Sequence, residues 1–249
     1  MILFNTDLDN TLIYSYKHDI GEDKVCVEIY NGREISFMTK KSHELLNSIK
    51  DKILIVPTTT RTIEQFSRID LGTGTLKYAL VCNGGVLLED GVENEVWYQE
   101  SCRLVSDCME ELKKAEVLLE NDKNRVFEIR DIKELFLFTK SREPYRSVES
   151  LKAELNPELV DVFCNGTKVY VVPKKLSKGM AIRRFRQWVG ADMIIAAGDS
   201  EFDISMLEEA DIAFAAEALI EKFPDRKNFI FEEKDIIFSD TILRYLKRR

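Results

Sequence analysis

Short apolar segments alternate with helical patterns along most of this chain, and that alternation most constrains its fold. Ile53 to Val56 is apolar without interruption, which is typical of a strand buried on both faces of a sheet. Met193 to Ala197 has the same character, and Ile2 to Thr6, which begins with three apolar residues, is predicted to be a short buried strand. Strands that alternate with helices favour a parallel sheet. We therefore expect an α/β fold with a Rossmann-like parallel-sheet core.

The segment after the first strand departs from this alternation. Val25 to Tyr30 and Glu34 to Phe37 are strand-like, and Asn31-Gly32 between them is a strong hairpin signal. The hairpin could narrow a substrate pocket or contact a second subunit. We favour the simpler interpretation, an edge hairpin with no role in a site.

A second interruption begins near Gly85 and ends at Pro173, and we interpret it as an inserted α+β domain. Its pattern predicts a long amphipathic helix, two strands, a helix and a hairpin, at Ser101–Glu120, Arg125–Arg130, Leu135–Thr139, Ser147–Leu155, Leu159–Cys164 and Lys168–Val172. The predicted domains are therefore a core of residues 1–84 and 174–249 and an insert of residues 85–173.

The remaining segments complete the predicted core. Helices are expected at Lys41–Ile49, Thr62–Ile69, Ser177–Val189, Glu201–Ala210 and Asp235–Leu246. Further strands are expected at Tyr78–Cys82, Ile212–Phe214 and Asn228–Phe231.

Composition excludes several classes of protein. A net charge of -8 disfavours nucleic acid and anionic membranes as partners. No run approaches the roughly 18 apolar residues of a membrane helix, and the start of the chain lacks the features of a signal peptide. Five scattered cysteines without a CxxC pair suggest neither disulfides nor zinc. We expect a cytoplasmic protein with a small phosphorylated substrate, and its oligomeric state stays open.

Polar side chains cluster where predicted strands end. Asp7-Leu8-Asp9-Asn10-Thr11 directly follows the first strand, where open α/β sheets bind ligands. Two close carboxylates repel each other, and a divalent cation relieves that repulsion. A solvated turn is the alternative interpretation of this segment.

Three other segments carry similar signals. Gly198 to Asp203 follows an apolar strand and opens a helix, so its acids could also serve as helix caps. Pro57 to Arg61 places hydroxyls and an arginine at another strand end, which suits phosphate oxygens, although a threonine-rich turn has the same composition. Lys178 begins a helix, and taken alone it is a solvated charge.

Together these segments resemble the haloacid dehalogenase-like superfamily in order, spacing and residue type. Asp7 to Thr11 is similar to its first motif, DxDxT, and Thr59 to the Ser or Thr of the second. Lys178 is similar to the lysine of the third motif, and Asp199 with Asp203 to the fourth, GDxxxD. The position of the insert resembles the Cof-like branch, in which a large cap covers the site. Sucrose-phosphate and mannosyl-3-phosphoglycerate phosphatases are similar in plan.

The resemblance implies a role for each residue. Asp7 would be the nucleophile that forms an aspartyl-phosphate, and Asp9 the general acid and base. Mg²⁺ would bind the Asp7 carboxylate, the Asp9 backbone carbonyl and Asp199, with Asp203 orienting the site. Thr59 and Lys178 would stabilise the phosphoryl group. The residues expected to bind substrate are Thr60, Arg61 and Asn83. Asn10 and Thr60 stand where related chains commonly have glycine.

An acid at position 9 favours phosphate monoesters, because an alkoxide leaving group needs a proton and a halide does not. The resemblance therefore implies a Mg²⁺-dependent phosphatase acting on a small phosphorylated metabolite, sugar phosphates first. A phosphomutase is the enzymatic alternative. A non-catalytic, phosphate-ligand-binding regulator is the alternative from another class, although the chain retains all the expected catalytic groups.

Overall fold

The computed structural model describes residues 1–223, 227–233 and 235–249, which divide into two compact units. Unit 1 contains Met1–Asn94 and Lys178–Arg249, and unit 2 contains Glu95–Ser177. The sequence placed these limits after residues 84 and 173. The first limit falls later because residues 86–93 form strands that pair within unit 1.

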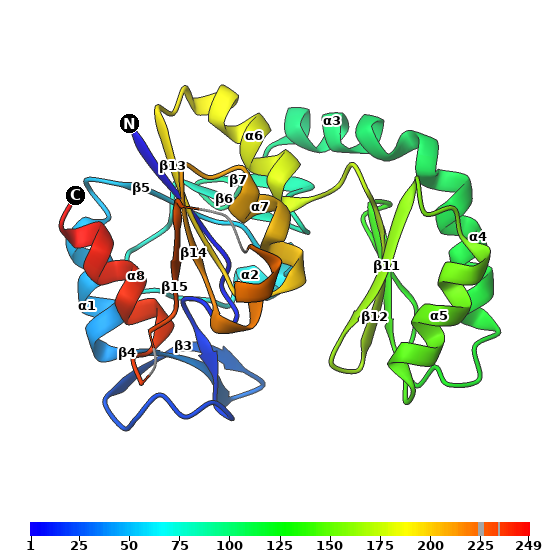
Figure 1. The fold of residues 1–249 in the computed structure, drawn as a ribbon, viewed down its shortest axis with the longest axis horizontal. Helices are drawn as coiled ribbons and strands as arrows, with labels where there is room; N and C mark the ends of the chain where they lie inside the picture. The colour runs from blue at the N-terminus through cyan, green and yellow to red at the C-terminus, as the bar shows by residue number, and fades with distance from the viewer. Residues whose placement is uncertain (224–226, 234) are drawn as a thin grey trace. The chain divides into compact units, whose positions relative to one another are not determined.

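A parallel sheet forms the centre of unit 1, which confirms the predicted α/β core (Figure 1). Its strand order is β15-β14-β13-β1-β5, and each neighbouring pair is parallel. The strands are β1 (Ile2–Thr6), β5 (Leu54–Pro57), β13 (Met193–Gly198), β14 (Ile212–Ala215) and β15 (Phe229–Phe231). The apolar runs in the sequence correspond to these strands because both faces of the sheet are covered.

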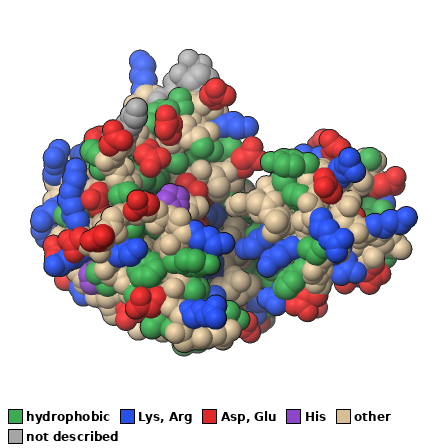
Figure 2. Space-filling model, turned by 90° about the horizontal axis from the view of Figure 1, so that it is seen from below, with side chains coloured by type: hydrophobic (Ala, Val, Ile, Leu, Met, Phe, Trp, Pro, Cys, Tyr) green, Lys and Arg blue, Asp and Glu red, His purple; other side chains and the backbone are tan. Residues whose placement is uncertain are grey.

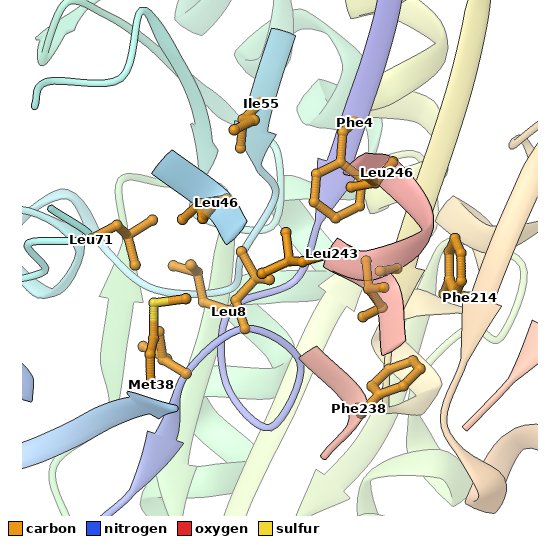
Figure 3. Close-up of a cluster of buried hydrophobic side chains, with 14 of the residues drawn as sticks. Phe4, Leu8, Met38, Leu46, Ile55, Leu71, Phe214, Phe238, Leu243 and Leu246 are labelled. Atoms are coloured by element: carbon orange, nitrogen blue, oxygen red, sulfur yellow. The ribbon is translucent and has the colours of Figure 1, made fainter. Parts of the chain in front are cut away.

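Helices cover both faces of this sheet. Helices α1 (Lys40–Ile49) and α8 (Phe238–Lys247) lie against one face, and α6 (Lys178–Val189) and α7 (Ile204–Glu208) against the other (Figure 1). On the first face, apolar side chains from the strands and helices form one buried cluster (Figure 3), which includes Phe4, Leu8, Leu46, Phe214 and Leu243. Burial of this apolar area stabilises the layered arrangement that holds the strand ends in place.

Two small antiparallel sheets complete unit 1. The predicted hairpin is confirmed as β3 (Lys24–Tyr30) and β4 (Arg33–Thr39), and the short β2 (Tyr14–Ser15) pairs with β4. Strand β6 (Tyr78–Val81) pairs with β7 (Val86–Glu89), which pairs in turn with β8 (Val92–Glu93). The hairpin of β7 and β8 was not predicted.

Unit 2 is an α+β layer pair. Its antiparallel sheet has the order β11-β12-β10-β9. Helices α4 and α5 pack on it through a buried cluster that includes Leu112, Leu151 and Val171. The elements are α3 (Glu95–Val105), a 3₁₀ turn η1 (Ser106–Cys108), α4 (Met109–Glu120), β9 (Arg130–Ile132), β10 (Phe136–Lys140), α5 (Pro144–Glu154), β11 (Val160–Asn165) and β12 (Lys168–Pro173).

Several predicted elements were wrong in extent. The helix predicted at 101–120 is α3 and α4 with a 3₁₀ turn between them, since Val105 leaves helical geometry at φ −98° and ψ 0°. The strand predicted at 125–130 begins only at Arg130. The helix predicted at 62–69 is a single turn, α2 (Ile63–Phe66). The helix predicted at 201–210 is a 3₁₀ turn, η2 (Glu201–Asp203), followed by α7, and a further 3₁₀ helix, η3, spans Glu217–Lys222.

The surface carries charges of both signs. On the face seen in Figure 2, acidic and basic side chains lie next to one another rather than in separate fields. Among the described residues, no helix is both long enough and apolar enough to cross a membrane.

Candidate active site

Three neighbouring parallel strands bring the predicted site residues to one edge of the sheet. Asp7 follows β1, Thr58 follows β5 and Asp199 follows β13. Sheet-like hydrogen bonds continue past the strand ends: the Asp7 amide donates to the Ala197 carbonyl at 2.9 Å, and the Thr58 amide donates to the Thr6 carbonyl at 2.7 Å. The backbone of the site is therefore an extension of the rigid sheet.

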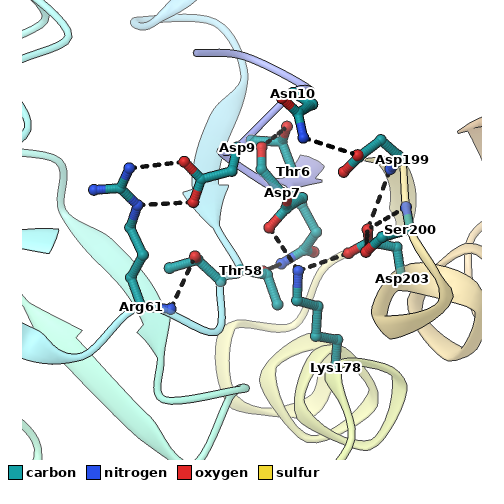
Figure 4. Close-up of polar contacts among 12 residues, drawn as sticks. Thr6, Asp7, Asp9, Asn10, Thr58, Arg61, Lys178, Asp199, Ser200 and Asp203 are labelled. Carbon is teal, nitrogen blue, oxygen red and sulfur yellow. Dashed lines mark hydrogen bonds and ion pairs between the residues drawn. The ribbon is translucent and has the colours of Figure 1, made fainter. Parts of the chain in front are cut away.

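Lys178 lies between two aspartates. Its Nζ donates to Asp7 Oδ1 and to Asp203 Oδ1, each at 2.6 Å (Figure 4). The side chains of Lys178 and Asp203 are 1% and 0% exposed. Burial alone lowers the pKa of Lys178, but attraction to Asp203 and Asp7 outweighs it and raises that pKa. Lys178 is therefore a charged ammonium inside the protein rather than a solvated one.

Close packing places Lys178 at this position. The Gly179 amide at the start of α6 donates to Ser205 Oγ at 3.1 Å. A Cβ atom on Gly179 would lie 2.3 Å from the Ser205 carbonyl oxygen. Only glycine therefore allows α6 to approach α7 this closely, which explains the Lys-Gly step in the sequence.

Asp203 connects the lysine to the loop that carries Asp199. Its Oδ2 accepts from the Asp199 amide at 3.1 Å and from the Ser200 amide at 3.0 Å. Gly198 permits this contact, because a Cβ atom there would lie 2.3 Å from Asp203 Cβ. Both Asp203 oxygens are thus used by protein donors, and the residue orients its neighbours.

Asp199 lies opposite the first motif. Its Oδ2 accepts from Asn10 Nδ2 at 3.3 Å. Burial, followed by repulsion from Asp203, raises the pKa of Asp199 to about 7. Asn10 has a φ of +58°, a left-handed conformation that asparagine adopts more readily than most residues, so it can replace the commoner glycine.

The acids at this edge fit a hard divalent cation. Asp7, Asp199 and Asp203 each offer one oxygen, and these atoms lie within 4.8 Å of one another. Burial is the main cause of the raised pKa of Asp7, and repulsion from Asp203, Asp199 and Asp9 adds to it. Among the described residues, Asp7 and Asp199 each keep one oxygen without a protein donor. Their carboxylates suit Mg²⁺, which prefers a few carboxylates and several waters.

The predicted phosphate loop lies beside these acids. Thr59 is buried, and its Oγ1 accepts from the Arg61 amide at 3.1 Å. The Asn83 amide donates to the Thr59 carbonyl at 2.9 Å, which brings Asn83 next to this loop. Thr60, which directly follows Thr59 in the chain, is half-buried. The structure therefore gathers Thr59, Thr60 and Asn83 at the end of β5.

Asp9 and Arg61 form a bidentate ion pair. Arg61 Nε donates to Asp9 Oδ2 at 2.8 Å and Nη2 donates to Oδ1 at 2.7 Å (Figure 4). The Asp9 side chain is 52% exposed, whereas that of Arg61 is 13% exposed. The Asp9 carboxylate therefore faces Arg61, and a metal contact from this residue stays a prediction for its backbone carbonyl alone.

Sequence reasoning missed this pair and its extension into the hairpin. Arg61 was expected to bind substrate, yet Asp9 and Glu28 already occupy its guanidinium. Glu28 lies in strand β3 and was not among the predicted site residues. An acid between Val27 and Ile29 in a strand-like segment was the available signal, since a charge at a buried strand position needs a partner.

The comparisons with known proteins give the family. A family model for haloacid dehalogenase-like hydrolases matches residues 92–235, more than half of the chain. The chain belongs to the haloacid dehalogenase-like hydrolase family. The matched segment includes Lys178, Asp199 and Asp203. No curated protein sequence matches the chain significantly.

Solved structures of this hydrolase fold cover nearly the whole chain. The sucrose-phosphatase of Synechocystis sp. PCC6803, in complex with sucrose and phosphate, has a TM-score of 0.69 at 15% identity over 99% of this chain and 97% of that one. Trehalose-6-phosphate phosphatase of Aspergillus fumigatus has a TM-score of 0.53 at 14% identity over 98% and 92%. A phosphatase of the haloalkanoate superfamily from Bacteroides thetaiotaomicron has a TM-score of 0.56 at 16% identity over 98% and 94%. At such identities these likenesses show the shared fold.

Proposed function

We propose that this hydrolase is a Mg²⁺-dependent phosphatase that cleaves the phosphate monoester of a small metabolite through an aspartyl-phosphate. The observation that carries the proposal is the buried Lys178 between Asp7 and Asp203 at the ends of neighbouring strands. A fixed ammonium beside a carboxylate is an arrangement that can receive a phosphoryl group, because the lysine offsets the charge that the group brings.

Each residue has a chemical task in this proposal. An oxygen of Asp7 attacks phosphorus, and the bond from phosphorus to the leaving oxygen breaks. Asp9, which takes up a proton on one oxygen as the substrate binds, gives that proton to the leaving oxygen, and it later takes a proton from the water that hydrolyses the aspartyl-phosphate. Thr59 donates a hydrogen bond to a phosphoryl oxygen. Thr60 and Asn83 contact the bound substrate, and direct contact from Arg61 stays a prediction.

Asp7 and Asp199 would hold the Mg²⁺, together with the backbone carbonyl of Asp9. When bound, the ion neutralises charge on the phosphoryl oxygens. Asp203 keeps the Asp199 loop and Lys178 in place through its two oxygens. The raised pKa values of Asp7 and Asp199 support the proposal, because a buried site with surplus carboxylates gains most from a cation.

We infer that a sugar phosphate is the substrate to try first. The sucrose-phosphatase and trehalose-6-phosphate phosphatase found among the solved structures share the fold over nearly the full length of this chain. Their printed names refer to sugar phosphates, and that is what suggests this class of substrate here.

The first experiment is hydrolysis of p-nitrophenyl phosphate with Mg²⁺ and with chelator, for the wild type and Asp7→Asn. We expect turnover that needs Mg²⁺ and disappears in the variant. Exposed Asp51→Asn is the control for loss of one charge. Full activity in Asp7→Asn would refute the nucleophile. Absence of turnover by the wild type on this ester and on a panel of sugar phosphates would contradict the phosphatase proposal.

A further inference from the structure

The hairpin carries a buried acid whose carboxylate bonds to polar side chains outside its own strand. Glu28 in strand β3 has a side chain that is 0% exposed. Its Oε2 accepts from Ser36 Oγ at 2.7 Å and pairs with Arg61 Nη1 at 2.9 Å. Its Oε1 accepts from Arg68 Nε at 3.1 Å. Burying a carboxylate costs desolvation free energy. Donors on both of its oxygens offset that cost, and they fix the positions of the donor side chains.

A β-bulge aims this carboxylate inward. The pairing of β3 with β4 shifts register on both sides of Glu28, between Cys26 and Glu28 and again between Glu28 and Ile29. As a result Val27 and Glu28, which are consecutive, are both buried. Bulges re-aim side chains in this way and often occur next to active sites. The other edge of β3 bonds to the segment after α2, because the Asp70 amide donates to the Val27 carbonyl at 2.8 Å.

Arg61 joins Glu28 to Asp9. Its Nε and Nη2 face Asp9, while Nη1 faces Glu28 and donates to the Gln65 carbonyl at 3.4 Å. A guanidinium is rigid and planar, so a contact at Nη1 fixes the direction of the opposite edge. The hairpin and the acid of the first motif are therefore two ends of one chain of ion pairs.

We propose that Glu28 is a positioning residue that, through Arg61, holds the Asp9 carboxyl in the direction needed for proton transfer to the leaving oxygen. The inference rests on the proposed role of Asp9 as the acid and base. It gives the hairpin a part in the reaction, where the sequence favoured none. Arg61 is the intermediary between Glu28 and Asp9.

The choice of leaving group separates positioning from general structural support. An alkoxide, as from a sugar phosphate, needs a proton as it leaves, whereas p-nitrophenolate leaves readily without one. Misplacing Asp9 should therefore slow cleavage of an alkyl phosphate far more than cleavage of p-nitrophenyl phosphate. A variant that merely loosens the fold would slow both substrates alike.

The test compares kcat/KM for the two ester classes in the wild type and Glu28→Gln. General acid catalysis contributes about 10²- to 10⁴-fold, so partial misplacement should cost about tenfold or more on the alkyl ester and only about twofold on the aryl ester. Glu34→Gln removes the same charge from an exposed position of the same hairpin and should change neither value. Equal losses on both esters in Glu28→Gln would overturn the proposal.

A second variant guards against a misfolded hairpin. Glu28→Gln combined with Arg68→Gln removes one charge of each sign and so avoids leaving two arginines around a neutral amide. We expect the same unequal loss in this double variant. If both ester classes respond alike there too, Glu28 does not act through Asp9.

Crystal structures of the wild type and Glu28→Gln separate failure of this inference from failure of the proposed function. We expect the variant to lose at least one of the two hydrogen bonds between Arg61 and Asp9. If both bonds persist unchanged, Glu28 does not position Asp9, whatever the activity. If the wild type lacks phosphatase activity yet the bonds depend on Glu28, the proposed reaction fails while the positioning contact stands.

Discussion

Replacing Lys178 with methionine measures how much one buried ammonium contributes to stability. Methionine keeps an unbranched apolar chain but removes the charge that Asp7 and Asp203 share. Both carboxyls would then be buried without their cation, and the pKa of Asp7, which burial already raises, would rise further. We expect the variant to unfold more easily, and the loss to depend on pH.

The magnitude follows from two estimates. Removing one partner of a buried ion pair costs roughly 3–5 kcal/mol. Separately, a carboxyl that must stay protonated at pH 8, against an unfolded pKa of about 3.9, costs about 5–6 kcal/mol as an upper limit. At pH 5 the same proton costs about 1.5 kcal/mol. Because a raised carboxyl pKa makes the folded state bind more protons, the deficit must grow as pH rises.

Urea denaturation in the presence of chelator at pH 8 and pH 5 checks both the size and the sign. Lys41→Met is the matched control, since Lys41 pairs with Asp240 at 3.5 Å but has a side chain that is 47% exposed. An exposed pair of this kind contributes about 0–1 kcal/mol. The reasoning fails if Lys178→Met loses no more than the control at pH 8, or if its deficit is larger at pH 5.

Two further predictions follow from the same site. Gly179→Ala should lower the free energy of unfolding by about 1–3 kcal/mol or more and reduce activity, because its Cβ would lie 2.3 Å from the Ser205 carbonyl oxygen. Gly32→Ala has open space and should cost only about 1–2 kcal/mol of left-handed strain without loss of activity, so equal activities would argue against the packing account. Since burial first and repulsion second raise the pKa of Asp199 to about 7, Mg²⁺ must displace a proton below that pH. Calorimetry should show a Kd that weakens about tenfold for each pH unit below 7, and a Kd independent of pH would contradict the assignment.

The strands of the core could be predicted because their physics is local. Residues 53–56 and 193–197 are apolar at every position, and such short runs are typical of strands in a sheet that is covered on both faces. The hairpin at Asn31-Gly32 was equally predictable, since both residues adopt positive φ values in the turn. The first and last residues of helices and strands were harder to predict from the sequence. The turn at Ser106–Cys108 interrupts a helical pattern whose periodicity continues on both sides.

The candidate site also contains residues that the sequence could predict and contacts that it could not. Asp7, Lys178, Asp199 and Asp203 could be named from sequence because their motifs have characteristic spacing, and the structure brings them together. The contacts of Arg61 could not be read in this way. Its bonds to Asp9 span 52 positions of the sequence, and its contact with Glu28 depends on a bulge in β3. An acid in a strand-like segment indicates that Glu28 needs a partner, but residue type does not show which arginine it contacts or where a bulge shifts the register.

Two separate charge networks therefore surround the two acids of the first motif, and their environments match the tasks proposed for them. Asp7 is buried and shares Lys178 with Asp203, so it is held in one direction and shielded from water. A nucleophile gains from both conditions. Asp9 is half exposed and held by Arg61, so it is oriented yet can exchange protons with water. An acid that must first give and then regain a proton needs that access. The two acids lie two residues apart, and the fold separates their chemistry by giving each its own cation.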